Sequence, residues 1–427
     1  MTTNPPAAPA TSAPSVADAR TSDPAALGWM TGSPPPSDRI IRYDDGSFLR
    51  FPMWRWSFSH WRELVPTVNV PRGPAAACPL PRAERDDLDA VRLTPLGGGR
   101  EMSWADSLAA NFTDGIVVLH RGRIAYERYF GALTAERPHI AFSVTKSFFG
   151  VIAATLVAEG ALDAAAPVRR YIPELAASGF GDARVDQVLD MTTALRHTEV
   201  YSDPTSDFAD YARATGLLPR RPGHAGAQST YEYLAAIPKD GEHGPAFTYR
   251  SINTDVVGWL IARVTLAPPH EVLRDRIWSV LGAEDDAHLQ VDSAGTPLVA
   301  VALNARLRDL ARFGEMLRRD GAYNGRQIVP AAVVADLRRG GDRDAFARAG
   351  YATLPGWSYH HQWWLSHNEH GAYTARGIHG QAIYVDPKAE MVIARFASHP
   401  LASNVNLDPT SLPAYHALAR HLMAHPG

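Results

Sequence analysis

Two segments that lie far apart in the chain share one pattern, an alternation of apolar and polar residues around a short polar turn. The first covers residues 115–131 and turns at "HRGR"; the second covers residues 382–398 and turns at "DPKAE". Two alternating runs joined by a turn predict a β-hairpin. Because one hairpin lies early and the other late, the sequence predicts one antiparallel sheet built from both ends of the chain.

The segments between the hairpins have helical spacing instead. We expect helices over 143–159, 251–265, 269–282 and 305–321, and helical spacing again after Pro413. The chain is therefore expected to be α+β, with an antiparallel sheet flanked by helices. We expect residues 106–160 and 285–427 to form the sheet domain and residues 161–284 to form a mostly helical domain.

The N-terminal region differs in composition from the rest. Residues 1–27 are rich in Pro, Ala, Ser and Thr, so we expect a disordered tail that cannot bury enough apolar surface to fold. Residues 28–105 are dense in Trp, Phe, Pro and Arg, and we expect an extension that wraps the main domain. The sequence shows no secretory signal and no apolar run of the roughly 18–20 residues of a membrane span. We therefore expect a cytoplasmic protein without membrane contact.

Several partner classes are disfavoured by composition. The formal net charge of −3 and the lack of a long basic stripe argue against nucleic-acid binding. Cys78 is the only cysteine, which excludes a disulfide framework and a cysteine-rich metal site. The histidines of "SYHHQWWLSHNEH", residues 358–370, match no common metal spacing, and no phosphate-binding or dinucleotide motif is present. We expect no metal and no cofactor.

Lysine is scarce, and one lysine has an unusual position. Lys and Arg total 42, but only Lys146, Lys239 and Lys388 are lysines. Lys239 and Lys388 lie in turn-like surroundings, whereas Lys146 lies at the start of a long apolar run. An amine can lose its proton in a protein and a guanidinium cannot. The lysine at this position suggests a need for that chemistry.

Ser143 lies three residues before Lys146, on the same face of the predicted helix. Burial lowers the pKa of an amine, so Lys146 could take the proton of Ser143. The helix N-terminus adds free N–H groups where a negative oxygen would develop. The pair is a candidate Ser-x-x-Lys nucleophile, although these letters also occur by chance and Ser143 could instead be a helix cap.

Two further segments could complete such a site. Tyr249 lies directly before a predicted helix and could relay a proton; the alternative is a half-buried loop tyrosine. Residues 374–387 form a glycine-punctuated strand along which a substrate could lie, with the Ile378 N–H as an oxyanion donor. The alternative there is a bulged strand without a ligand.

With these pieces in order, the chain resembles the serine β-lactamase and penicillin-binding-protein superfamily. Within it, the chain is most similar to the branch of class C-like carboxylesterases and 6-aminohexanoate-dimer (nylon oligomer) hydrolases. The stretches that carry the resemblance are "RWSFSHWRELVP", "FSVTKSFFG", "VDQVLDMTT", "VYSDP", "FTYRSINTDV", "QWWLSHNEHG" and "GIHGQAIYVDP". The resemblance implies a β-lactamase/transpeptidase-like fold with the site between the sheet and the helical domain, and it suggests a homodimer.

The resemblance also implies a role for each catalytic candidate. Ser143 would be the acylated nucleophile, Lys146 its base and Tyr249 the proton relay. The backbone N–H groups of Ser143 and Ile378 would form the oxyanion hole.

Four further residues are implied in substrate binding. Tyr201 in "EVYSDP" matches a tyrosine on a mobile loop that closes over the substrate amide in the nylon-oligomer branch. Ser251 belongs to the second motif of the superfamily, and Gly377 and His379 belong to the strand of the third.

The chain departs from the superfamily at three places. Residues 249–251 read Tyr-Arg-Ser where Tyr-x-Asn is common, and residues 375–377 read Ala-Arg-Gly where Lys-Thr-Gly is common. Both departures point away from penicillins. Ala212 stands at about the position of an acidic residue that grips the free amine in the best oligomer hydrolases; Asp207 and Asp210 are near but not aligned.

The sequence thus predicts a cofactor-free serine hydrolase that cleaves short-chain esters, and small linear amides such as the 6-aminohexanoate dimer, through an acyl-enzyme. Two alternatives stay open. A D-amino-acid amidase or D-peptidase would be recognised by its activity on D-alanyl amides. A penicillin-recognising sensor would be acylated without releasing the acyl group.

Overall fold

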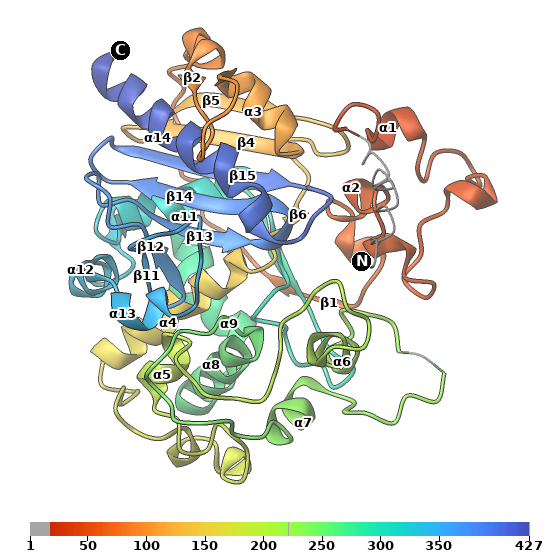
Figure 1. Ribbon diagram of the computed structural model, residues 1–427, viewed down its shortest axis with the longest axis vertical. Coiled ribbons are helices and arrows are strands. Elements are labelled where there is room, and N and C mark those ends of the chain that lie inside the picture. Colours follow the sequence, from red (N-terminus) through yellow and green to blue (C-terminus); the bar gives the residue numbers. More distant parts are fainter. Residues whose placement is uncertain (1–17, 221, 427) are drawn as a thin grey trace, which may run out of the picture.

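A large antiparallel sheet and a helical region below it make up the molecule (Figure 1). The structure is a computed structural model, and it describes residues 18–220 and 222–426. The sheet occupies the upper half of Figure 1, and helices from the middle of the chain occupy the lower half.

The main sheet has seven strands in the order β11-β12-β13-β14-β15-β4-β5, and each neighbouring pair is antiparallel. The predicted hairpins are β4–β5 and β14–β15, and β15 pairs with β4, placing Ile393 opposite Val118. The predicted α+β fold, with one sheet from both chain ends, is therefore confirmed. The bounds of the strands are β4 (Thr113–His120), β5 (Arg123–Tyr129), β11 (Ser358–His360), β12 (Trp363–Leu365), β13 (Tyr373–Gly377), β14 (Gln381–Asp386) and β15 (Met391–Ala397).

Both faces of the sheet are covered. Val117 and Leu119 of β4 enter the core on the side of α11 (Leu307–Arg318). Ile116 and Val118, which alternate with them, enter a second core that includes residues of α3 (Trp104–Ala110) and α14 (Asp408–Ala424). Alternate side chains of a strand point to opposite faces, so one apolar run supplies two cores.

The regular elements within residues 161–284, residue 221 excepted, are all helical. They are α5 (Val185–Leu189), α6 (Asp207–Ala214), α7 (Thr230–Ala235), α8 (Ser251–Thr265), α9 (Pro269–Leu273), α10 (Ser279–Leu281) and the 3₁₀ turns Val168–Arg170 and Pro173–Leu175. The predicted helix 251–265 coincides with α8. The predicted helix 269–282 is instead divided into α9 and α10 by a π-helical turn over Arg274–Trp278. α8 packs against α5 and against α4 (Val144–Ala158).

A second, four-stranded sheet ties the N-terminal extension to the segment that precedes α4. Its order is β1-β7-β8-β6, all antiparallel. The strands are β1 (Thr67–Val70), β6 (His139–Ile140), β7 (Ala287–Gln290) and β8 (Leu303–Ala305). Strands of two to four residues are too short for alternation to reveal them, which is why the sequence did not predict this sheet.

The remaining described elements are short. They are α1 (Pro24–Leu27), α2 (Trp54–Ser57), α12 (Ala331–Arg339), α13 (Arg343–Ala347), β2 (Arg92–Leu93), β3 (Met102–Ser103), β9 (Ala322–Tyr323), β10 (Arg326–Gln327) and the 3₁₀ turns Ser37–Arg39, Ser47–Leu49, Trp61–Glu63, Asp86–Ala90, Ile378–Gly380 and Asn404–Asn406.

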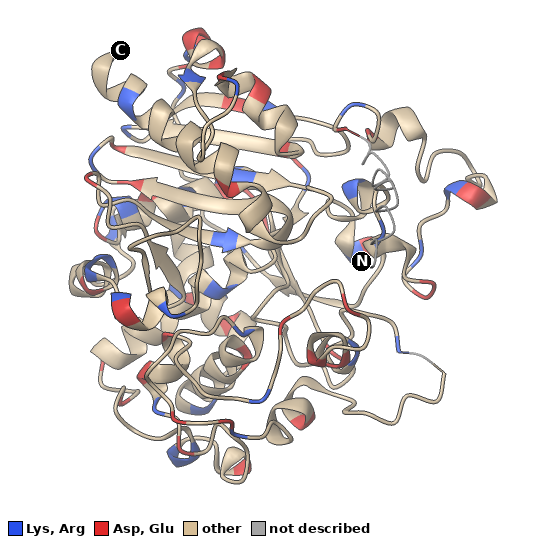
Figure 2. Ribbon diagram, viewed as in Figure 1, with Lys and Arg blue, Asp and Glu red and all other residues tan. Residues whose placement is uncertain are grey.

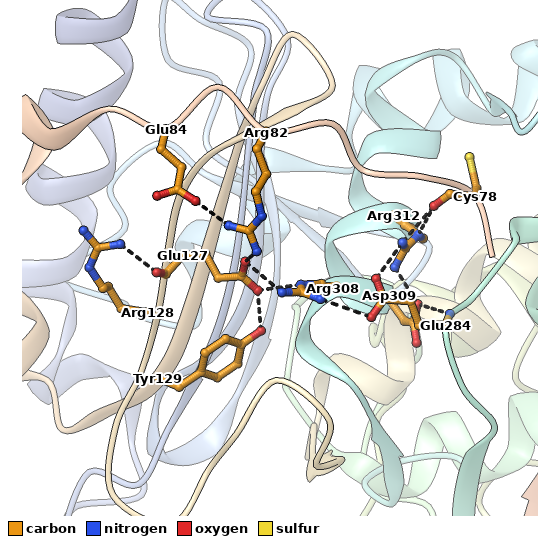
Figure 3. A network of polar contacts seen from close by, with 10 residues as sticks. All are labelled: Cys78, Arg82, Glu84, Glu127, Arg128, Tyr129, Glu284, Arg308, Asp309 and Arg312. Atoms are coloured by element: carbon orange, nitrogen blue, oxygen red, sulfur yellow. Dashed lines mark hydrogen bonds and ion pairs between the residues drawn. The ribbon is translucent and has the colours of Figure 1, made fainter.

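A network of charged residues fastens the extension to the sheet and to α11 (Figure 3). Glu127 of β5 accepts hydrogen bonds from Arg82 at 2.5 Å and from Arg308 at 2.6 Å. Arg312 of α11 donates to the carbonyl of Cys78 at 2.8 Å. Because Glu127 is buried, its negative charge needs these arginine partners to offset the cost of removing it from water. The network therefore holds residues 78–82 against the main sheet.

Part of the predicted disordered tail is structured. Residues 1–17 lie outside the described part of the chain, but α1 falls within residues 18–27. The side chain of Asp23 caps α1, and Arg55 donates a hydrogen bond to the carbonyl of Ala19 at 2.5 Å. The predicted end of the tail at residue 27 is therefore too late, because polar contacts and the burial of Pro24 hold this segment.

The C-terminal helix begins earlier than predicted. The sequence indicates helical spacing after Pro413, whereas α14 starts at Asp408 and contains this proline. A proline cannot donate to the carbonyl four residues before it. Here that carbonyl, of Pro409, accepts a hydrogen bond from the Leu96 N–H at 2.8 Å instead. The Leu96 N–H of the N-terminal extension thus supplies the hydrogen bond that Pro413 cannot donate to this carbonyl.

Charges are mixed over the visible ribbon, with basic and acidic residues interspersed on both halves (Figure 2). Among the helices of residues 18–220 and 222–426, none is long and apolar enough to cross a membrane.

Candidate active site

Ser143 lies at the N-cap of α4, shortly after the end of β6. Phe142, directly before it, is buried and has a positive φ of 43°. A left-handed conformation is costly for a bulky residue and is kept only when the surroundings enforce it. The rings of Phe58 and Phe142 lie 4.8 Å apart, and the Ile140 N–H donates to the carbonyl of Phe58. The N-terminal extension thus supports the sharp turn that presents Ser143.

Lys146 lies one turn into α4 and faces Ser143, as the spacing predicts. Its Nζ lies 2.9 Å from Ser143 Oγ, 3.0 Å from Ser251 Oγ and 2.6 Å from the carbonyl oxygen of Ala300. When the amine is neutral, its two N–H bonds can serve Ser251 and Ala300. The lone pair then faces the hydroxyl of Ser143, which is the geometry of a base and its nucleophile.

The surroundings of Lys146 favour the neutral amine. The side chain is 1% exposed, and this burial lowers the pKa of Lys146 below its ordinary value. The charges of Glu199 and Asp255 raise the pKa of Lys146 part of the way back. A buried lysine with a lowered pKa can accept a proton near neutral pH, which arginine could not do.

Glu199 organises the far side of Lys146, and the sequence analysis missed it. Its carboxylate accepts hydrogen bonds from the Ser251 hydroxyl at 2.6 Å and from the Ser251 N–H at 2.5 Å. It also accepts from the Tyr201 hydroxyl at 2.8 Å. Ser251 therefore links Lys146 to Glu199. Glu199 and Ser251 lie 52 positions apart, and no spacing rule connects a loop glutamate to a helix that far along the chain.

Tyr249 lines the same pocket as Ser143. Lys146 Nζ lies 5.3 Å from the centre of the Tyr249 ring. Burial, with the charge of Glu199, raises the pKa of Tyr249 well above its ordinary value. Tyr249 therefore keeps its proton and is suited to donating a hydrogen bond, whereas Lys146 is suited to accepting the proton of Ser143.

Two backbone N–H groups are available beside the nucleophile. Among the described residues, the N–H groups of Ser143 and Ile378 have no hydrogen-bond acceptor on the backbone. Ile378 is half-buried and lines the pocket. A Cβ on Gly377 would lie 2.7 Å from the carbonyl oxygen of Ala141, so only glycine lets the end of β13 approach this close to the loop before Ser143. The two N–H groups could bind a developing oxyanion.

The pocket itself is bounded mainly by aromatic and polar side chains. Tyr201 lies in its wall, and its ring packs 4.7 Å from Phe208. Arg376 forms an ion pair with Asp408, and its guanidinium lies 5.2 Å from the centre of the Trp364 ring. The lining residues are Ser143, Tyr201, Tyr249, Tyr351, Trp364, Arg376, Ile378, Ser403, Asn404, Val405 and Asp408.

Three residues predicted to bind substrate lie behind the pocket wall. Ser251 is 1% exposed, and its hydroxyl bridges Lys146 and Glu199. His379 is 6% exposed, with Nδ1 hydrogen-bonded to the carbonyl of His399 at 2.7 Å. Gly377 is buried between two lining residues. None of the three is among the residues that line the pocket.

The sequence of this chain is similar to those of known proteins. The model of the family described as Beta-lactamase matches residues 106–410. A 6-aminohexanoate-dimer hydrolase of Paenarthrobacter ureafaciens is 35% identical over 355 residues, which is 83% of this chain and 88% of that protein.

Solved structures show the same similarity. A putative 6-aminohexanoate-dimer hydrolase from Bacillus anthracis superposes with a TM-score of 0.83 at 31% identity, covering 91% of this chain and 99% of the other. A family VIII carboxylesterase superposes with a TM-score of 0.56 at 19% identity, covering 74% of this chain and 96% of the other. The latter likeness is one of fold.

Proposed function

This chain belongs to the Beta-lactamase family and is a serine hydrolase; from that premise we propose that it cleaves short-chain carboxylic esters and small linear amides of the 6-aminohexanoate-dimer type. The reaction runs through an acyl-enzyme on Ser143. The contact of 2.9 Å between Ser143 Oγ and the buried Nζ of Lys146 is the observation that carries the proposal.

The first half of the reaction forms the acyl-enzyme. Lys146 takes the proton of Ser143, whose oxygen attacks the substrate carbonyl. The N–H groups of Ser143 and Ile378 bind the oxyanion of the tetrahedral intermediate. As the intermediate collapses, Tyr249 donates its proton to the leaving alkoxide or amine and receives the proton held by Lys146. The alcohol or amine departs, and the acyl group stays on Ser143.

The second half releases the acid. A water molecule attacks the acyl carbonyl and gives up a proton to Lys146, directly or through Tyr249. The same two N–H groups hold the new oxyanion. Collapse of this intermediate returns a proton to Ser143 Oγ and frees the carboxylic acid, so that the enzyme regains its starting protonation state.

The pocket wall supports a linear substrate with an apolar chain. Trp364, Tyr351 and Val405 offer apolar surface for a methylene chain. A linear dimer of an amino acid carries an amine at one end and a carboxylate at the other. Arg376 and Asp408 lie in this wall as one buried ion pair, so they could contact a polar group at one end of the substrate but not both ends at once. The chain has no acidic residue at Ala212, which is buried in α6.

The substrate assignment is tested by assaying the native chain on p-nitrophenyl butyrate and on the linear 6-aminohexanoate dimer. We expect multiple turnovers of both, with a higher kcat/KM for the ester because its leaving group is better. The amide product is measured as new free amine. Turnover of the ester alone would remove the amide from the proposal. Failure on both, in a chain that instead hydrolyses D-alanyl amides, would favour a D-amino-acid amidase.

The role of Glu199 predicts a change in pH dependence. The neutral form of Lys146 is active, so kcat/KM falls as the pH drops through the pKa of Lys146. Glu199 raises the pKa of Lys146, and Glu199→Gln removes that charge. We expect the acidic limb of the kcat/KM profile on p-nitrophenyl butyrate to move to lower pH, by about one unit. The maximal kcat/KM should fall roughly 10-fold because Ser251 loses a charged acceptor.

The matched control is Glu242→Gln, which removes an exposed carboxylate on the loop before Tyr249. Its profile should coincide with that of the native chain. A limb that stays in place in Glu199→Gln, or moves to higher pH, would contradict the assignment of this limb to Lys146.

A further inference from the structure

A small cavity lies between the main sheet and α14, beside the catalytic pocket. Its lining residues come from β13, β14, β15, α14 and the segment before α14. Arg376 and Asp408 line both this cavity and the catalytic pocket. The cavity has a volume of about 20 Å³, and one water molecule needs roughly 10–15 Å³ of such space. It therefore has room for a single water molecule or a single small ion.

Two arginines reach this cavity from one face of the sheet. Arg376 of β13 lies opposite Ala382 of β14, and Ala382 lies opposite Arg395 of β15. Side chains that are directly opposite on neighbouring strands point to the same face. Because neighbouring strands lie about 4.8 Å apart, the backbones of the two arginines are separated by roughly 10 Å, with a single methyl group between them. Both arginines line the cavity that this small residue leaves.

One carboxylate serves these two arginines. Asp408 Oδ1 accepts a hydrogen bond from Arg376, and Asp408 Oδ2 accepts one from the hydroxyl of Thr353 at 2.7 Å. Both oxygens of Asp408 are therefore engaged. Arg395 donates from Nε to the carbonyl of Gly380 at 2.8 Å, and it forms no ion pair with any residue that the structure describes. Its positive charge thus has no carboxylate of its own.

Burial makes this charge costly. Arg395 is 4% exposed, and a buried charge is normally paired because it loses the stabilisation that water provides. The guanidinium lies 5.4 Å from the centre of the Tyr415 ring, a cation–π contact that offsets part of the cost. The hydroxyl of Tyr415 is also buried, and it has no hydrogen-bond partner among the described residues. The residues around the cavity therefore include an unpaired positive charge and an unused O–H donor.

From this arrangement we propose that the cavity binds one small monovalent anion of the chloride class. The N–H groups of Arg395 that do not contact Gly380 and the O–H of Tyr415 would donate to it, and hydrogen bonds to an ionised partner are stronger than neutral ones. One negative charge balances the excess positive charge that is left after Arg376 pairs with Asp408. A water molecule would accept these hydrogen bonds but would leave the charge of Arg395 unbalanced.

The size of the cavity sets which anions fit. A volume of about 20 Å³ admits a monatomic ion and excludes anions built from many atoms, such as gluconate or a substrate carboxylate with its chain. The bound anion would therefore be a structural ligand and not a substrate. By neutralising Arg395 it would leave Asp408 wholly to Arg376, and these two residues also line the catalytic pocket. The anion would thus hold this part of the pocket wall in place, a role that is independent of the proposed hydrolysis.

The native chain gives the most direct test. Crystals of the full chain, grown without halide, are soaked in sodium bromide, and bromide is located by its anomalous scattering. We expect one bromide in the cavity, in contact with the guanidinium of Arg395 and the hydroxyl of Tyr415. A cavity that holds only water, or bromide bound at the surface only, would overturn the proposal.

In solution, the midpoint of thermal unfolding should depend on chloride, because a ligand that binds only the folded chain stabilises it. The midpoint is measured in sodium chloride and in sodium gluconate at equal ionic strength. We expect chloride to raise the midpoint of the native chain saturably, by roughly 1–3 °C once its concentration exceeds its Kd by 10- to 100-fold. Arg395→Gln removes the unpaired charge and should abolish this rise. An equal response of the native chain and Arg395→Gln would mean a general salt effect and would contradict the site.

A pair of tyrosine variants tests the second donor. Tyr415→Phe removes only the O–H group and should weaken chloride binding about 10-fold. The matched control is Tyr373→Phe, because the hydroxyl of Tyr373 is likewise buried without a hydrogen-bond partner among the described residues, but Tyr373 is not among the residues that line the cavity. This control should keep the native response to chloride. Similar losses in both variants would count against the proposal, and hydrolysis of p-nitrophenyl butyrate shows that each variant is folded.

Discussion

Ser143→Ala is expected to lower kcat for p-nitrophenyl butyrate by at least about 10³-fold, with a smaller change in KM. The substitution removes an oxygen that lies 2.9 Å from Lys146 Nζ and borders the pocket. The pocket and the two backbone N–H groups stay in place. Substrate should therefore still bind, while the acyl-enzyme cannot form.

The control for Ser143→Ala is Ser147→Ala, one turn further along α4. The hydroxyl of Ser147 donates to the carbonyl of Gln362, away from Lys146. This variant should keep most of the native kcat, because it loses one structural hydrogen bond and no reacting group. Comparable losses of kcat in both variants would indicate damage to α4 rather than removal of a nucleophile.

Lys146→Arg is expected to lower kcat/KM for the same ester by about 10²–10⁴-fold, the usual contribution of a general base. Arginine keeps the positive charge but cannot give up its proton at working pH. It therefore cannot accept the proton of Ser143. Its larger head must also fit where Nζ now contacts Ser143, Ser251 and the carbonyl of Ala300. Lys146→Met removes the amine with less strain and should give a loss of similar size.

The other two lysines supply matched controls. Lys239 pairs with Asp182 at the surface, and Lys388 lies in the turn between β14 and β15. Lys239→Arg and Lys388→Arg should both keep the native kcat/KM. Activity that survives Lys146→Arg would mean that another group takes the proton of Ser143.

The sequence predicted the fold where elements were long and periodic. The hairpins at 115–131 and 382–398 and the helix at 251–265 follow from residue spacing alone. Short strands such as β6 and β8 were not predicted, because an alternation of apolar and polar residues cannot be recognised in two or three residues. The start of α14 was predicted too late because the partner of the Pro409 carbonyl, the Leu96 N–H, comes from a distant part of the chain.

The candidate site likewise contains residues that sequence spacing placed correctly and residues that only the folded chain brings together. Ser143 and Lys146 are helix neighbours, so sequence spacing placed them correctly against each other. Ser251 was predicted to bind substrate but lies behind Lys146, since its orientation depends on how α8 packs against α4. Glu199 lies on a loop and Asp408 at the start of α14, far from these motifs, and only tertiary packing brings Glu199 to Ser251 and Asp408 to the pocket wall.

The most direct test of the proposed acyl-enzyme is the time course of p-nitrophenol release from p-nitrophenyl butyrate, with acid-quenched samples analysed by mass spectrometry. The account predicts continued turnover and, in the quenched native chain, one butyryl group on the peptide that contains Ser143; Ser143→Ala should show neither. Release that stops after one equivalent would indicate an acyl-binding protein rather than a hydrolase. Turnover in Ser143→Ala, or a butyryl group at another residue, would contradict the central claim.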